Sequence, residues 1–111
     1  MMQLTALDVP VRARFYHGLA DPSRLAILDA LWSVERTVSE VAGVTGLSVS
    51  MTSRHLTCLK DCGLVVARQA WRHVYYQLAP GVADLLAAND AFIAQVADRV
   101  AACERPEMGE A

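Results

Sequence analysis

The three cysteines are the residues whose chemistry and spacing most clearly suggest a site. Cys58 and Cys62 are four residues apart, and on a helix this spacing puts both thiols on one face, with Cβ atoms about 5–6 Å apart. Two such thiolates can share one metal ion, and Cys103 can supply a third sulfur from its own or a partner subunit. Three sulfurs without an imidazole suit a large thiophilic ion rather than magnesium or calcium. The alternative is that the cysteines are small packing residues.

Two helices are predicted before residue 33. Apolar residues at helical spacing predict the first at 11–20. Asp21-Pro22 is typical of a helix start, because Asp21 can cap the helix and proline suits its first position. This second helix is expected to end near Trp32 and to bury four apolar side chains, Leu25, Ile27, Leu28 and Leu31.

Two further helices are predicted around the cysteine pair. A short one is expected at 38–44, with Thr37 as its cap and Gly46 just beyond its end. The next is expected to run from its cap Ser48 to Cys62, followed by Gly63 in the left-handed conformation. The four-residue turn between them makes this pair a candidate helix-turn-helix.

A hairpin and a last helix complete the predicted order. The β-rich runs 64–68 and 74–78 are separated by 69–73, which predicts a hairpin. Pro80-Gly81 then opens a helix whose long apolar stripe we assign to a dimer interface: Val82, Leu85, Leu86, Phe92, Ile93, Val96 and Val100.

The predicted fold is therefore mainly α with a small β-hairpin: a dimeric winged helix-turn-helix. We expect an N-terminal arm at 1–10, one DNA-binding and dimerisation domain at 11–104, and a polar tail at 105–111. The homodimer would form through the first and last helices. The hydrophobic fraction of 54% exceeds what a chain of 111 residues readily buries, which also favours an oligomer.

Two segments resemble ArsR/SmtB-family repressors: Gly18-Leu19-Ala20-Asp21-Pro22-Ser23-Arg24-Leu25, and Leu47 to Leu56 followed by Gly63-Leu64-Val65. The resemblance covers roughly residues 11–79 and implies a homodimeric repressor that binds double-stranded operator DNA. The wing departs from the family pattern, because Gln69-Ala70-Trp71 stands where a glycine turn is usual. We expect Trp71 to pack or insert.

The candidate DNA-contacting residues lie on the fourth helix and on the wing. Arg54 is the expected base reader, since a guanidinium forks onto guanine, while Ser50 and Ser53 suit phosphates or base edges. Val49 could contact a thymine methyl group. The wing adds Arg68, Arg72 and His73, which suit the phosphate backbone or an adjacent minor groove.

The stretch His55-Leu-Thr-Cys-Leu-Lys-Asp-Cys62-Gly-Leu-Val resembles CmtR-type cadmium/lead sensors. That resemblance implies that Cys58, Cys62 and Cys103 bind Cd(II) or Pb(II) and that the metal releases the DNA. As(III) and antimony also accept three sulfurs, mercury is a further alternative, and a thiol redox switch is another.

Other classes of protein fit the sequence poorly. We find no apolar run near 18 residues and no secretory signal, and three cysteines cannot all pair, so a cytoplasmic protein without a membrane partner is expected. An enzyme is not expected, because no Cys-x-x-Cys, glycine-rich phosphate loop or acid/base pair is present. The net charge of −2 does not exclude DNA binding, because residues 11–73 carry eight Arg and Lys residues against five acidic residues.

Overall fold

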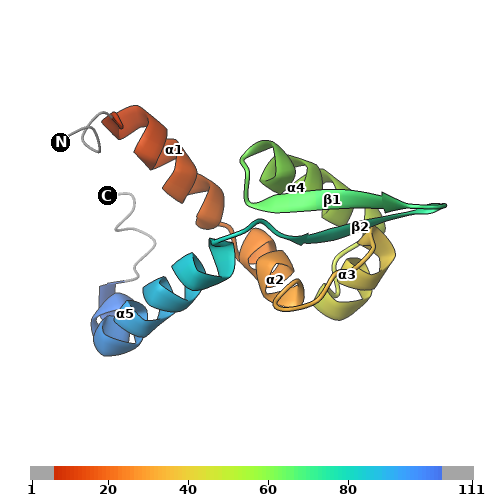
Figure 1. Cartoon of the computed structure of the whole chain (residues 1–111). Helices are drawn as coiled ribbons and strands as arrows, with labels where there is room; N and C mark the ends of the chain where they lie inside the picture. Colours follow the sequence, from red (N-terminus) through yellow and green to blue (C-terminus); the bar gives the residue numbers. More distant parts are fainter. Residues whose placement is uncertain (1–6, 104–111) are drawn as a thin grey trace. The chain divides into compact units, whose positions relative to one another are not determined.

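The computed structural model describes residues 7–103. Its elements, in chain order, are α1 (Val9–Leu19), α2 (Pro22–Ala30), α3 (Val38–Thr45), α4 (Val49–Asp61), β1 (Val65–Ala70), β2 (His73–Leu78) and α5 (Val82–Cys103), as Figure 1 shows. This is the predicted order, and the winged helix-turn-helix is confirmed. The predicted tail 105–111 and most of the predicted arm 1–10 lie outside the described residues.

Local capping signals explain where α1 and α2 begin. The Asp21 side chain accepts a hydrogen bond of 2.9 Å from the Arg24 amide, and Pro22 opens α2 as predicted. The first helix begins at Val9, two residues before the predicted start. The reason is a second cap of the same kind, because the Asp8 carboxylate accepts from the Val11 amide at 3.1 Å.

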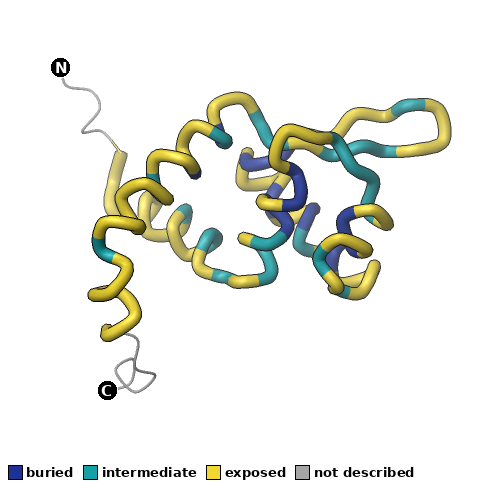
Figure 2. Tube along the Cα trace, turned by 90° about the horizontal axis from the view of Figure 1, so that it is seen from below, coloured by how far each residue is buried: buried dark blue, intermediate teal, exposed yellow. Residues whose placement is uncertain are grey.

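The chain divides into two units, Met1–Ala79 and Pro80–Ala111. In the first unit α2 packs against α3 and α4, and α4 packs against β1. Figure 2 shows the buried residues gathered in these elements. The core consists of fully buried side chains from all four: Ile27, Leu28, Leu31, Val41, Leu56, Leu59 and Val65.

Leu25 was predicted to belong to this core, and that prediction is wrong. Its side chain is 41% exposed, whereas Ile27, Leu28 and Leu31 are buried. At 3.6 residues per turn, Leu25 lies roughly 110° from the centre of the face formed by those three residues. It therefore points away from α3 and α4.

The wing is tighter than predicted. The antiparallel register pairs Val65 with Leu78 and continues to Ala70 with His73, so the connection is the two-residue turn Trp71-Arg72 rather than 69–73. The base of the wing is joined to the loop after α2, because Arg36 and Tyr76 exchange backbone hydrogen bonds of 3.0 and 2.8 Å. The hairpin is thereby fixed to the helical core.

The second unit contains α5. Of its predicted apolar stripe, Val82 and Leu86 are buried, while Leu85, Phe92, Ile93 and Val100 are exposed. Within residues 7–103, no helix is both long enough and apolar enough to cross a membrane.

Candidate functional site

The helix-turn-helix is built from three side-chain caps and a glycine. Thr37 and Glu40 form a reciprocal capping box at the start of α3, with hydrogen bonds of 2.9 and 3.2 Å. Gly46 ends α3 in the left-handed conformation at φ 81°, and the Ser48 hydroxyl then accepts from the Met51 amide at 3.0 Å to start α4. These short-range bonds fix the direction in which α4 leaves α3.

The four candidate DNA residues on α4 share its exposed side. Thr52, Leu56 and Leu59 face the core, whereas the sequence-predicted contacts are all exposed: Val49, Ser50, Ser53 and Arg54. The structure thus leaves the N-terminal half of α4 free of core contacts on the side that carries a guanidinium and two small hydroxyls. Such a surface can approach a major groove closely.

Arg68, the first wing candidate, is held by partners that the sequence did not indicate. Its guanidinium donates two hydrogen bonds to the Glu35 carboxylate, at 2.9 and 2.7 Å, and lies 5.1 Å from the centroid of the Tyr75 ring. The hydrogen bond from Arg68 lowers the pKa of Glu35. A phosphate would have to compete with Glu35 for this guanidinium.

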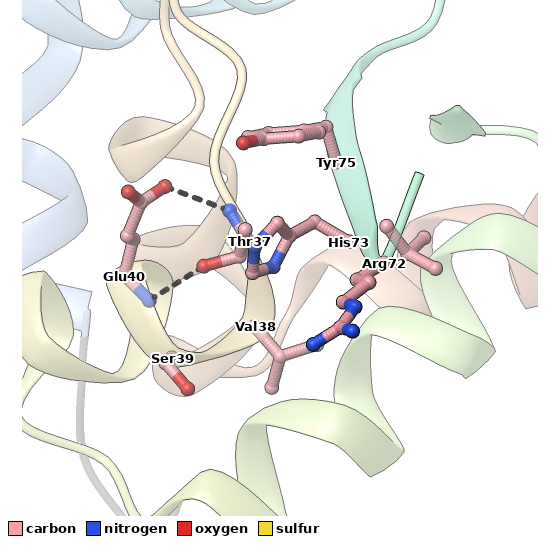
Figure 3. Close-up of a pocket in the computed structure, with 8 residues that line it drawn as sticks. Thr37, Val38, Ser39, Glu40, Arg72, His73 and Tyr75 are labelled. Carbon is pink, nitrogen blue, oxygen red and sulfur yellow. Dashed lines mark hydrogen bonds between the residues drawn. The ribbon is translucent and has the colours of Figure 1, made fainter. Parts of the chain in front are cut away.

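Arg72 and His73 line a groove of about 420 Å³ between β2 and the N-terminal turn of α3 (Figure 3). Thr37, Val38, Ser39 and Glu40 form its other side. The two basic residues therefore lie next to the helix-turn-helix, as a DNA-binding surface requires.

Trp71 does not pack into the protein. Its side chain is 85% exposed at the tip of the wing. The Arg72 guanidinium lies 5.0 Å from the centroid of its ring. Of the two roles predicted for Trp71, packing against residues 7–103 is therefore excluded.

Cys58 and Cys62 lie together at the C-terminal end of α4, with Cys62 as its C-cap, and both are exposed. Burial raises the pKa of the Cys62 thiol, and the neighbouring Cys58 thiol raises it further. Cys103 ends α5, in the second unit, and is also exposed. Among residues 7–103, no group of three or more His, Cys, Asp or Glu side chains is arranged to hold a metal ion.

Comparison with known proteins decides the family. Residues 21–66 match the model of the bacterial regulatory protein, arsR family. A probable mercury resistance operon repressor of Streptomyces lividans is 40% identical over 100 residues, which cover 88% of this chain and 80% of the relative. The chain belongs to the ArsR family. It is a transcriptional regulator and not an enzyme.

Two further similarities extend the ArsR-family match. The regulator CmtR of Mycobacterium tuberculosis (strain H37Rv) is 38% identical over 104 residues, covering 86% of this chain and 88% of CmtR. The solution structure of a homodimeric winged helix-turn-helix DNA-binding domain from Mycobacterium bovis has a TM-score of 0.76 and 33% identity, covering 89% of this chain and 93% of that one.

Within this ArsR-family chain, the family match spans α2, α3 and α4 and the start of β1. It therefore includes the exposed side of α4 and the Cys58–Cys62 pair, but neither the wing tip nor Cys103. Sequence reasoning missed Glu35 and Tyr75 as the partners of Arg68. No local pattern could indicate the ion pair, because Glu35 and Arg68 are 33 residues apart.

Proposed function

We propose that the chain is a homodimeric repressor that binds operator DNA and releases it when a soft metal ion binds Cys58, Cys62 and Cys103. The observation that carries this proposal is the position of the Cys58–Cys62 pair. Both thiols stand at the C-terminal end of α4, the helix whose N-terminal half exposes Ser50, Ser53 and Arg54. A metal bound there acts on the DNA-reading helix itself.

Two features couple the metal to the DNA. Cys103 belongs to the second unit, so an ion held by all three sulfurs ties α5 to α4 and restricts the orientation of the reading helix. In addition, three neutral thiols that become three thiolates around a divalent ion add one net negative charge close to the DNA-facing helix. Both effects lower DNA affinity, and the coupling is reciprocal, typically about 1–3 kcal/mol.

The protons released by the thiols make metal binding dependent on pH. The raised pKa of Cys62 means that this thiol is protonated at neutral pH in the free protein. Metal binding must displace that proton, so metal affinity decreases as the pH falls.

Cd(II) and Pb(II) are the proposed effectors, on the basis of the three-sulfur donor set and the similarity to CmtR. Hg(II) is the second candidate, and the observation that favours it is the 40% identity to a probable mercury resistance repressor. As(III) accepts the same three sulfurs. Zinc is disfavoured because it usually takes a fourth ligand.

We assign dimerisation to α1 and α5, each of which carries apolar side chains that its own unit leaves exposed. On α1 these are Val9, Val11 and Tyr16, and on α5 they are Leu85, Phe92, Ile93 and Val100. Figure 2 shows most of both helices as exposed. Exposed apolar faces of this kind mark protein–protein contacts.

The test is fluorescence anisotropy of a labelled 30-bp duplex, enriched from a random pool by the metal-free protein. Adding one equivalent of Cd(II) or Hg(II) per subunit should release the duplex from the wild-type protein. The variants C58S, C62S and C103S should bind the duplex like the wild type but keep it when metal is added. Release that is unchanged in all three variants would contradict the proposed site.

A further inference from the structure

The tip of the wing carries a large apolar side chain that the helix-turn-helix does not explain. Trp71 is 85% exposed, more than any other large apolar side chain between residues 7 and 103. In Figure 1 the tip of the β1–β2 hairpin extends beyond α3 and α4. The indole therefore has no core to stabilise.

The backbone at Trp71 is also unusual for a tryptophan. Its φ is 59°, in the left-handed region. Trp71 is the first residue of a two-residue hairpin turn, a position where a positive φ favours glycine. The Gln69 side-chain amide donates to the Trp71 carbonyl at 2.9 Å and supports the turn. An exposed aromatic kept in a disfavoured conformation points to a role outside folding.

The charge around Trp71 indicates what it contacts. Residues 65–78 contain no acidic residue, and although Arg68 is paired with Glu35 from the loop after α2, Arg72 and His73 remain beside the tip. The Arg72 guanidinium stacks on the indole, 5.0 Å from its centroid. A basic group beside an exposed apolar wedge is the combination that minor-groove proteins use, because the groove is strongly negative and its base steps can be opened by an apolar side chain.

The wing is attached to the reading helix in a way that lets its tip reach that groove. The Leu64 amide donates to the Leu59 carbonyl at 2.9 Å, and α4 packs against β1. Six strand residues at about 3.3 Å each extend roughly 20 Å from that junction. This exceeds the ~12 Å width of the major groove. With α4 in the major groove, the tip can therefore reach the neighbouring minor groove.

We propose that the Trp71 indole, with Arg72 beside it, is an intercalating element that partly unstacks a base step in the minor groove beside the α4 site. The indole inserts at a flexible pyrimidine–purine step, and Arg72 contacts the groove walls. This element adds affinity and a sequence preference at base pairs that α4 does not reach. The inference rests on DNA binding through α4 and is independent of the metal site.

The decisive variant is W71G, assayed without metal on the 30-bp duplex enriched by the wild-type protein. Glycine accepts the positive φ, so W71G should melt a few degrees higher than the wild type. It should nevertheless bind the duplex about tenfold more weakly, because the inserted side chain is lost. A tenfold loss of affinity corresponds to about 1.4 kcal/mol. The matched variant W71F, which keeps an aromatic wedge, should retain most of the affinity.

One spectroscopic control and one base substitution test whether Trp71 enters the minor groove. The chain has two tryptophans, so W32F leaves Trp71 as the only indole, and its emission should be quenched when the duplex binds. Replacing flanking guanines by inosine removes only a minor-groove amino group. This replacement should change the affinity of the wild type and leave that of W71G unaltered.

The inference is overturned if W71G binds the duplex within twofold of the wild type, if Trp71 emission does not change, or if W71G loses stability together with affinity. Metal release of the same duplex separates this claim from the proposed function. If W71G binds weakly but is still released by Cd(II), both claims stand. If the wild type is not released while W71G binds weakly, the metal proposal fails and the minor-groove element stands.

Discussion

Thr52 on α4 offers a quantitative test of how the reading helix is held in the core. Its side chain is 0% exposed, and its hydroxyl has no hydrogen-bond partner within residues 7–103. A buried polar group without a partner costs about 1–3 kcal/mol. Valine has nearly the same shape, so Thr52→Val should fill the same space and remove that cost. We expect the free energy of unfolding to rise by about 1–2 kcal/mol.

The assay is thermal and urea unfolding of the metal-free protein, since a gain of 1 kcal/mol raises the Tm of a domain this size by about 4–8 °C. The control is Thr57→Val on the same helix, because Thr57 is exposed and its hydroxyl donates to the Ser53 carbonyl at 3.0 Å. That substitution should change the stability by no more than about 0.5 kcal/mol. A Thr52→Val protein that is less stable than the wild type would refute the reasoning.

Three further predictions concern the DNA and thiol surfaces. Arg54→Ala should weaken duplex binding about 5- to 150-fold, as loss of a base-reading arginine does, with the Tm unchanged; a lower Tm instead would give Arg54 a structural role. Glu35→Gln should release Arg68 for a phosphate contact, so duplex affinity in anisotropy titrations should rise. The slope of log affinity against log salt concentration should steepen by about one. Weaker binding would mean that the ion pair positions the wing. Burial and the Cys58 thiol raise the pKa of Cys62, so iodoacetamide should alkylate Cys62 appreciably only when the pH exceeds the usual thiol pKa of about 8.5. Mass spectrometry of the labelled peptides measures this reaction, and rapid labelling at pH 7 would contradict the expectation.

The predictable parts of the fold are those encoded by short-range signals. Asp21-Pro22, Thr37 and Ser48 begin helices where the sequence predicted, and Gly46 and Gly63 adopt the left-handed conformation that ends α3 and follows α4. Each involves groups only a few residues apart, so the pattern is complete in the local sequence. The exposed side of α4 follows from the same helical periodicity.

The errors and omissions have long-range or geometric causes. Leu25 is apolar and helical, but its angular position puts it outside the buried face, which a list of apolar residues does not reveal. The wing turn is shorter than predicted because the strands pair as far as Ala70 and His73, despite the positive φ that this requires at Trp71. The Glu35–Arg68 pair depends on how the wing meets the loop after α2, and the sequence alone carries no signal for it.

The proposed metal site also has one part that the local sequence predicts and one part that it does not. The helical spacing of Cys58 and Cys62 predicted that both thiols lie on one face of the helix, and the Cys58 thiol is close enough to raise the pKa of Cys62. Cys103 lies 41 residues beyond Cys62, in the second unit, and no local pattern relates it to the pair. Its part in the metal site therefore stays a prediction.

Ultraviolet titration of the reduced protein with Cd(II), Pb(II), Hg(II) and arsenite tests the central claim most directly. The account predicts a sulfur-to-metal charge-transfer band that saturates at one ion per subunit and is lost or strongly altered in each of the variants C58S, C62S and C103S. Absence of the band in the wild-type protein, or a C103S variant that titrates like the wild type, would contradict the three-sulfur site.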